Sequence, residues 1–164
     1  MKEMKLDELV VNPFTFFSHP AIAVTTAGDK TNALTISWGA LGTLWNKSCV
    51  FVFIRNSRYS YKLFENGDFY SVCFLDKDHN DKFKYLGKVS GKDEDKIKGS
   101  GLTLAYEDGV PYFAESDLVI IAKKLVSAIL PSDDIKDKAV YDKYYAEGGY
   151  HTVYPGEIIK ILKK

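Results

Sequence analysis

The sequence has few cysteines, and their positions argue against two kinds of structure. Only two occur in 164 residues, Cys49 and Cys73, and each lies inside an apolar run. Such residues are typical of buried thiols and not of a disulfide framework or a cysteine-rich metal site. The three histidines, His19, His79 and His151, also lack the spacing of metal ligands. We therefore expect no metal site and a reducing location such as the cytoplasm.

Net charge and long apolar runs are missing as well. Twenty-two basic residues balance 22 acidic ones, so no general field attracts nucleic acid or an anionic membrane, and any anion site must be local. The first residues, MKEMKLDELVVNPF, mix acids with lysines and lack the apolar core of a signal peptide. No later run approaches the length of a membrane span. We expect a soluble, unexported protein without a nucleic-acid or membrane partner.

The chain also lacks internal repeats, low-complexity tracts and linkers. A chain of 164 residues is long enough to bury roughly two thirds of its unfolded surface in one core. The sequence therefore predicts a single domain over residues 1–164.

Short β-rich runs separated by turn residues dominate what is present. Strands are predicted over residues 21–26, 32–41, 49–54, 69–75 and 150–162, and a hairpin around the turn EDGV joins residues 102–106 and 111–114. Residues 118–130 fit a helical stripe too, but their β-branched content favours a long buried strand. This order lacks the regular alternation of a doubly wound sheet. It predicts a mainly β protein, a mostly antiparallel barrel with a few peripheral helices.

Three helical regions are predicted among these strands. The first begins with Ser57 as N-cap and ends before Gly67. The second, within residues 78–98, forms one or two short helices broken at Ser90 and Gly91, and its alternating charges indicate that most of its residues form a solvated surface. The third covers residues 132–145.

Residues 32–47, NALTISWGALGTLWNK, combine small polar and apolar residues in alternation. In a strand one face carries Ala33, Thr35 and Ser37, and the other carries Leu34, Ile36 and Trp38. The second face belongs to the core. The first either lets a flat ligand approach the backbone closely or faces water.

A second feature is a cluster of anion-binding residue types after the apolar run 49–54. Arg55, Ser57 and Arg58 lie where that strand ends and a helix is predicted to start. Free backbone N–H groups, the helix dipole and guanidinium forks all attract phosphate. In the alternative interpretation Ser57 merely caps the helix and both arginines point to solvent.

Five segments in this order resemble the flavin reductase-like, FMN-binding split-barrel family: NALTISWGALGTLWNK, RNSRYS, FYSVCFL, YLGKVSGKDEDK and GGYHTVYPGEI. The resemblance covers roughly residues 20–161. It implies a Greek-key split β-barrel assembled as a homodimer, with FMN bound noncovalently near the subunit interface. It also implies a reductase that passes electrons from NADH or NADPH through FMN to a flavin or another acceptor.

The resemblance also implies particular site residues. Those matching the cofactor-binding positions are Asn32, Thr35, Ile36, Ser37, Trp38, Arg55, Ser57, Arg58, Tyr59, Ser60, Ser90 and Lys92. Lys92 stands where the family motif SGRD has arginine, which keeps the charge but loses the planar fork. His151 matches a histidine near the nicotinamide or flavin, so it is either the catalytic candidate or a structural residue. Gly149 replaces the usual aspartate before the Tyr-His pair.

Two other classes of function remain open at this point. An FMN-binding electron carrier would be reduced by a partner redox protein and would have no NAD(P)H activity of its own. A ligand-binding barrel of the pyridoxamine-phosphate oxidase type, or one without a redox role, would not need the reductase chemistry. We expect Trp45 and most of the tyrosines to lie in the core or at a dimer interface instead of contacting a cofactor.

Overall fold

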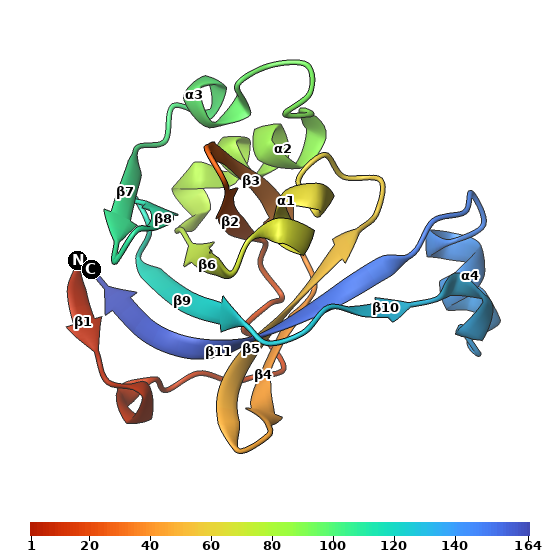
Figure 1. The fold of residues 1–164 in the computed structure, drawn as a ribbon, viewed down its shortest axis with the longest axis horizontal. Coiled ribbons are helices and arrows are strands. Elements are labelled where there is room, and N and C mark those ends of the chain that lie inside the picture. Colours follow the sequence, from red (N-terminus) through yellow and green to blue (C-terminus); the bar gives the residue numbers. More distant parts are fainter.

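The computed structural model describes residues 1–164 and contains a nine-stranded antiparallel sheet that curls into an open barrel (Figure 1). Its strands run in the spatial order β3 (Lys30–Ile36), β2 (Ala21–Ala27), β6 (Phe69–Phe74), β9 (Leu118–Lys124), β11 (His151–Lys163), β5 (Lys47–Arg55) and β4 (Gly39–Leu44). Two short strands, β1 (Lys2–Met4) and β10 (Ala128–Leu130), also pair with β11. Strands β3 and β4 do not pair, so the barrel is not closed.

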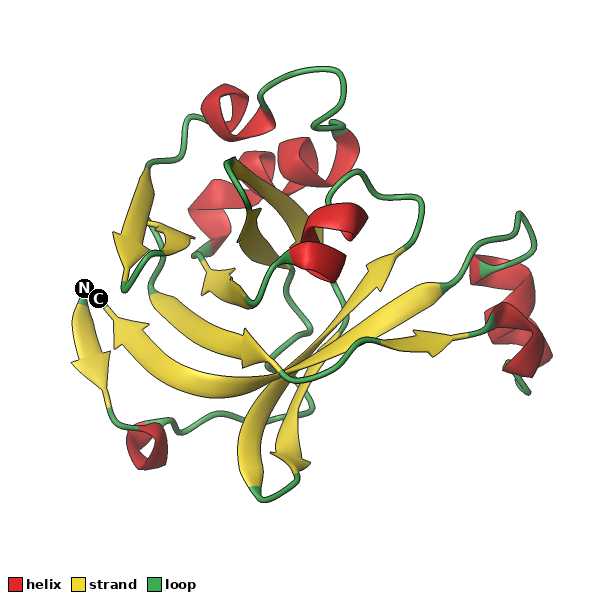
Figure 2. Cartoon of the chain, in the orientation of Figure 1, coloured by secondary structure: helices red, strands yellow, loops and turns green.

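A separate hairpin and four helices complete the fold. Strands β7 (Leu104–Glu107) and β8 (Val110–Phe113) form the hairpin predicted around EDGV. The α-helices are α1 (Tyr61–Asn66), α2 (Asn80–Lys88), α3 (Lys96–Ser100) and α4 (Lys138–Tyr144), and 3-10 turns occur at Leu6–Glu8, Lys77–His79 and Ser132–Asp134. Figure 2 shows α1, α2 and α3 on one side of the barrel and α4 well apart from them. None of the helices has both the length and the apolar composition of a membrane span.

Two apolar clusters lie on opposite faces of the curved sheet. Successive strand residues point to opposite faces, so Ala21 and Ala23 join one cluster whereas Ile22 and Val24 join the other. One cluster fills the barrel, where the buried hydroxyl of Tyr70 lies 2.9 and 2.8 Å from two backbone carbonyl oxygens. The other lies beneath α2 and the β7–β8 hairpin. Because both faces are covered, β2 is apolar on both sides.

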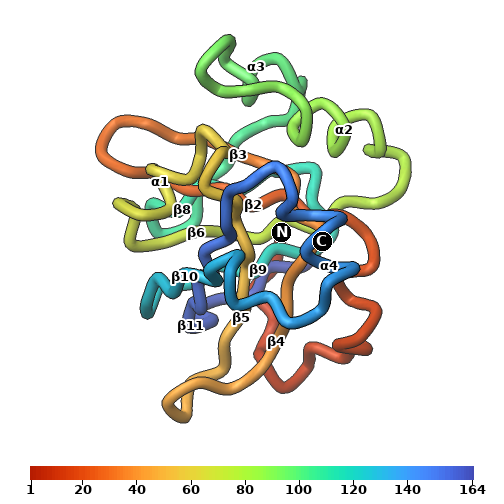
Figure 3. The backbone as a smooth tube through the Cα atoms, turned by 90° about the vertical axis from the view of Figure 1, so that its right-hand side faces the viewer, coloured from red at the N-terminus to blue at the C-terminus, as the bar shows by residue number.

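Strand β11 pairs with more strands than any other strand of the sheet. It contains 13 residues and pairs with β1, β5, β9 and β10. One end lies beside β1, which brings the two chain termini together (Figure 1). At its other end, residues 128–149, here called the arm, carry β10 and α4 away from the barrel, as Figure 1 shows. Figure 3 views the molecule from this side, with α4 in front.

Four predicted elements differ from the structure. The strand expected over 32–41 is broken at Ser37 and Trp38, and the one expected over 118–130 is interrupted between β9 and β10. The helix expected from Ser57 begins only at Tyr61, and the one over 132–145 is a 3-10 turn followed by α4. The prediction for 78–98 is confirmed, since α2 and α3 flank a loop that contains Ser90 and Gly91.

Candidate functional site

A pocket of about 430 Å³ opens where β3, β5 and β11 meet the arm. Its volume is in the range of small-molecule and cofactor sites. The residues that line it are Leu34, Thr35, Ile36, Ser37, Trp38, Phe53, Ile54, Arg55, Arg58, Tyr144 and His151. We call this the large pocket. It brings together residues from the segment 32–47, the arginine cluster and the Tyr-His pair.

The break between β3 and β4 lets the neighbouring residues Ser37 and Trp38 line the same pocket. In a continuous strand Ser37 and Trp38 would point to opposite faces, but here both line the pocket. The backbone passes so close to Phe17 that a Cβ on Gly39 would lie 2.4 Å from that ring. Trp38 turns toward the arm, with its ring centre 5.1 Å from that of Tyr144. The close passage at Gly39 and the packing of Trp38 therefore place two neighbouring side chains at one site.

His151 is buried at the start of β11, opposite Arg55 of β5. Burial lowers its pKa to about 4, and the positive charges of Arg55 and Arg58 add to this shift, so the imidazole is neutral at pH 7. The hydroxyl of Tyr145 lies 2.9 Å from Nδ1 of His151. When this hydroxyl donates to Nδ1, the ring proton lies on Nε2. In that tautomer His151 can donate a hydrogen bond from Nε2.

Arg55 is held by the loop that joins the arm to β11. Its Nη2 donates to the carbonyl oxygen of Gly148 at 2.6 Å, and its guanidinium lies over the ring of Tyr145 at 5.9 Å. Gly149 has a φ of +87°, and a Cβ there would lie 3.1 Å from Oδ1 of Asn56. Glycine suits this left-handed, tightly packed position. No acidic side chain lines the large pocket.

A smaller pocket of about 80 Å³ adjoins the large one, since Leu34 and Arg58 line both. The other residues that line it are Ser57, Tyr59, Ser60, Lys88, Val89, Ser90 and Lys96. The predicted N-cap role of Ser57 is wrong. Helix α1 begins after Ser60, whose Oγ instead accepts a hydrogen bond of 2.9 Å from Nδ2 of Asn32. Because α1 has only six residues, its dipole is a weak source of anion affinity.

The strongest electrostatic feature of the small pocket is a pair of cations without a carboxylate partner. Lys96 is buried, and its Nζ donates to the carbonyl oxygens of Leu86 at 2.8 Å and Val89 at 3.1 Å. Nη1 of Arg58 donates to the carbonyl oxygen of Gly87 at 2.8 Å. Burial, together with the nearby charge of Arg58, lowers the pKa of Lys96 to about 8. Two neighbouring charges with only carbonyl partners form a site suited to an anion.

Two predicted residues line neither pocket. Asn32 is buried in β3 behind Ser60, which it helps to hold in place. Lys92 is exposed on the loop after α2 and lines a separate pocket with Arg58 and Tyr59. Their predicted contacts with a ligand therefore remain predictions.

Several residues of both pockets were not foreseen from the sequence. Phe53 and Ile54 belong to an apolar strand, and Tyr144 lies in the arm, so only the tertiary fold brings them to the site. Lys96 belongs to the run KDEDK, which alternating charge indicated to be solvated surface. That interpretation is wrong for Lys96, because α3 turns its side chain beneath the end of α2. The sequence held no signal that distinguished this lysine from its neighbours.

Comparison with known families identifies the relationship. Residues 14–162 match the model of the flavin reductase like domain. The chain belongs to this family. No protein with a curated description matches the sequence.

Solved structures of family members and similar proteins share the fold at low sequence identity. Flavoredoxin from Methanosarcina acetivorans aligns with a TM-score of 0.71 and 18% identity over 100% of this chain and 76% of that one. An FMN-binding protein from Thermus thermophilus aligns with a TM-score of 0.68 and 16% identity over 99% of this chain and 80% of that one. The flavin reductase HpaC, solved as a complex with NADP⁺, aligns with a TM-score of 0.64 and 17% identity over 88% of this chain and 77% of that one. The expected split-barrel fold is confirmed.

Proposed function

We propose that this chain is an FMN-binding flavin reductase that takes electrons from NADH or NADPH and passes them to a flavin or another acceptor. Membership of the flavin reductase-like family supports the class of reaction. The observation that carries the proposal is the pair Arg58 and Lys96, two cations without an anionic partner, at one end of a pocket large enough for a flavin ring. This arrangement suits a ligand with a flat ring and a phosphate.

The residues present fit such a cofactor. Strand β3 forms one edge of the main sheet, so the backbone groups on its outer side bond to no further strand. Near Ser37 and Trp38 these groups are free to hydrogen-bond the polar edge of a ring in the large pocket. Donors placed there stabilise negative charge that grows on reduction. FMN supplies the electron-accepting ring, while the protein supplies placement and electrostatics.

The phosphate end of the cofactor is assigned to the small pocket. We propose Ser57, Ser60 and Ser90 as hydroxyl donors beside Arg58 and Lys96. Hydrogen bonds from charged donors to phosphate are the strong class of such bonds, and the low dielectric around Lys96 strengthens them further. A phosphate would also relieve the repulsion between the two cations.

His151 is assigned the position beside the reacting ring. Its lowered pKa makes it a neutral donor at pH 7 and not a general acid, so its Nε2–H would orient a polar group of the nicotinamide or flavin. Trp38, whose ring centre lies 4.7 Å from that of His151, would form the adjoining wall.

A second function is favoured by one feature of the site. Gly149 stands where the family pattern has an acid, and no carboxylate lines the large pocket. Without such a group the chain would act as an FMN-binding electron carrier that a partner redox protein reduces. Flavoredoxin is among the proteins with this fold. Anaerobic stopped-flow mixing of the FMN-loaded protein with NADH and NADPH separates the two, since bleaching by neither nucleotide would favour the carrier.

We further propose a cytoplasmic homodimer. Helix α4 has no buried residue, and the arm exposes Ile129, Leu130, Val140 and Tyr141. Exposed apolar residues on a projecting element need a partner surface, and a second copy would supply it. Both cysteines are free and buried, which fits a reducing compartment.

The first experiment is the visible spectrum of the purified protein, with the released cofactor identified by mass. Flavin absorbance and the mass of FMN would support the proposal. A colourless protein that does not quench FMN fluorescence on titration would contradict it and favour a barrel without a redox role.

A further inference from the structure

A third pocket, of about 580 Å³ and so larger in volume than the large pocket, adjoins the small pocket. Arg58 and Tyr59 line both of these pockets, so a ligand that reaches the small pocket can continue into the third. We call it the cationic pocket. Its three lysines come from different elements: Lys30 from the start of β3, Lys62 from α1, and Lys92 from the loop after α2.

The charge of this pocket is unbalanced. Lys30, Lys62, Lys92 and Arg58 line it, and no acidic residue does. The three lysine side chains are exposed and form no ion pair with any carboxylate, whereas other lysines of the chain, such as Lys160, are paired. These lysines thus offer positive charge that no ion pair neutralises.

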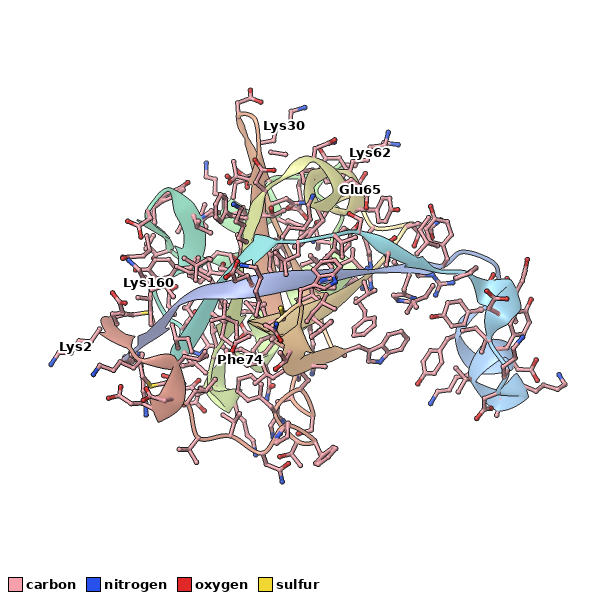
Figure 4. All side chains as sticks on the ribbon, turned by 60° about the horizontal axis from the view of Figure 1, so that its bottom comes forward. Lys2, Lys30, Lys62, Glu65, Phe74 and Lys160 are labelled. Carbon is pink, nitrogen blue, oxygen red and sulfur yellow. The ribbon has the colours of Figure 1, made fainter.

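Acidic residues lie close to this pocket but do not pair with its lysines. Asp29, Glu94 and Asp95 line a neighbouring pocket that shares Lys30 and Tyr59. Glu65, one turn after Lys62 on α1, accepts a hydrogen bond from the hydroxyl of Tyr154 in β11, so its carboxylate faces the barrel. Figure 4 shows Lys30 and Lys62 on the same side of the molecule, with Glu65 nearby and Lys2 at the far side. The cations of this pocket therefore face solvent and are free to meet an anionic ligand.

An aromatic ring stands beside these charges. Tyr59 is 41% exposed, although large apolar rings are usually covered. The loop after α2 packs against this ring so closely that a Cβ on Gly91 would lie 2.8 Å from its Cδ1. The ring of Tyr59 is packed on one side and open on the other, so a nucleobase can stack on its open side while the lysines attract phosphate.

We propose that the cationic pocket binds the adenosine-phosphate half of a dinucleotide whose other half occupies the large pocket. This inference rests on the proposed function. The ligand that fits this path is FAD, in which the group is joined to the flavin phosphate. The shared path through Arg58 places a second phosphate beside Lys62 and Lys92, and the adenine beside Tyr59.

The test uses a double substitution, Lys30→Gln with Lys62→Gln, in the full chain. Neither lysine lines the large or the small pocket, so FMN affinity is expected to stay within about twofold of the original. Exposed charges contribute modestly, so we expect FAD to bind about 5- to 10-fold more weakly, with the difference shrinking at high salt. The matched control, Lys2→Gln with Lys77→Gln, changes net charge equally at exposed positions outside the pocket.

Two measurements decide the identity of the ligand. Weaker FAD binding in the double variant than in the control, with an unchanged KM for NAD(P)H, supports the proposal. A KM for NAD(P)H raised about 5-fold, with FAD binding unchanged, would place the nicotinamide dinucleotide there and overturn it. Equal FAD affinity in the double variant and the control also overturns it.

A third titration separates this proposal from the assignment of the flavin. Binding of 5′-ADP alone, measured by calorimetry, requires no flavin. If the protein proves to bind no flavin, the proposed function fails, but 5′-ADP binding that the Lys30 and Lys62 substitutions weaken still supports an adenosine-phosphate pocket. Absence of 5′-ADP binding to a protein that binds FMN, together with equal affinity for FMN and FAD, overturns the pocket and leaves the flavin assignment intact.

Discussion

Burial changes the acid–base chemistry of Lys96. In the ligand-free protein its pKa is about 8, because it is buried next to Arg58, and a neighbouring phosphate dianion would raise that pKa. Binding of FMN above pH 8 therefore requires proton uptake, and FMN affinity should fall as pH rises through 8 toward 10. Below pH 7 Lys96 is charged both with and without FMN, so its titration should not change the FMN affinity there.

Fluorescence titration of FMN between pH 6.5 and 9.5 measures this dependence. In Lys96→Met, FMN should bind more weakly at pH 7 and the decline above pH 8 should disappear. A decline of the same size in Lys96→Met would assign the titration to another group.

Arg58 provides the sharpest test of the phosphate assignment. A hydrogen bond to a charged group contributes roughly 1.5 to 3 kcal/mol, so Arg58→Ala should weaken FMN binding about 10- to 100-fold. Riboflavin has the same ring without the phosphate, and its affinity should hardly change. Fluorescence quenching measures both ligands, and equal affinity of the unmodified protein for riboflavin and FMN would remove the phosphate site.

His151 and Tyr145 can be separated by kinetics. His151→Ala should slow reduction of bound FMN by NAD(P)H while leaving FMN affinity and Tm nearly unchanged. Tyr145→Phe removes only the hydroxyl that fixes the imidazole tautomer and should give a smaller loss of the same kind. Stopped-flow traces and melting curves check this. Parallel losses of Tm and rate in His151→Ala would show a structural histidine.

At the scale of elements, the break between β3 and β4 depends on Gly39. A Cβ there would lie 2.4 Å from the ring of Phe17, so Gly39→Ala should destabilise the protein by about 1 to 3 kcal/mol through overpacking. Adding Phe17→Leu should recover part of the loss.

Gly42 offers a matched control in the same strand. A Cβ at Gly42 meets only the ring of Phe51, at 3.5 Å, so Gly42→Ala should be neutral or slightly stabilising. Urea denaturation compares the variants. Equal effects at both glycines would show that packing against Phe17 does not set the break.

Strands and helices differ in how far the sequence predicted them. Alternation, turn residues and apolar runs identified the barrel strands and the β7–β8 hairpin, because these signals are local. The break at Ser37 and Trp38 could not be predicted, since it depends on the ring of Phe17, about 20 residues away in sequence. Similarly, Ser57 resembled an N-cap, but tertiary contacts of the 57–60 turn delay α1 until Tyr61.

The residues of the candidate site also differ in how far the sequence predicted them. Arg58, Trp38 and His151 could be predicted from residue type and family resemblance, and the structure brings them to one pocket. Lys96 and Tyr144 could not, because the first lies in a run of alternating charge and the second in the arm. Their roles depend on how α3 and α4 lie against distant strands.

At the scale of the whole molecule, the exposed apolar residues of the arm lead us to expect a dimer. Sedimentation at micromolar concentration should give twice the chain mass of 18.5 kDa, with flavin bound. Val140→Glu with Tyr141→Glu should shift the protein toward monomer, because both residues are exposed on α4. A monomer that retains flavin at this concentration would contradict the dimer.

The central position of β11 also affects how the protein forms during synthesis. Because β11 separates β9 from β5 in the sheet, a nascent chain without it holds two disconnected pieces, β3–β2–β6–β9 and β5–β4. Both would expose apolar strand edges until residues 151–163 leave the ribosome. The same residues include His151, so cooperative folding and assembly of the candidate site would coincide only after residues 151–163 have been synthesised.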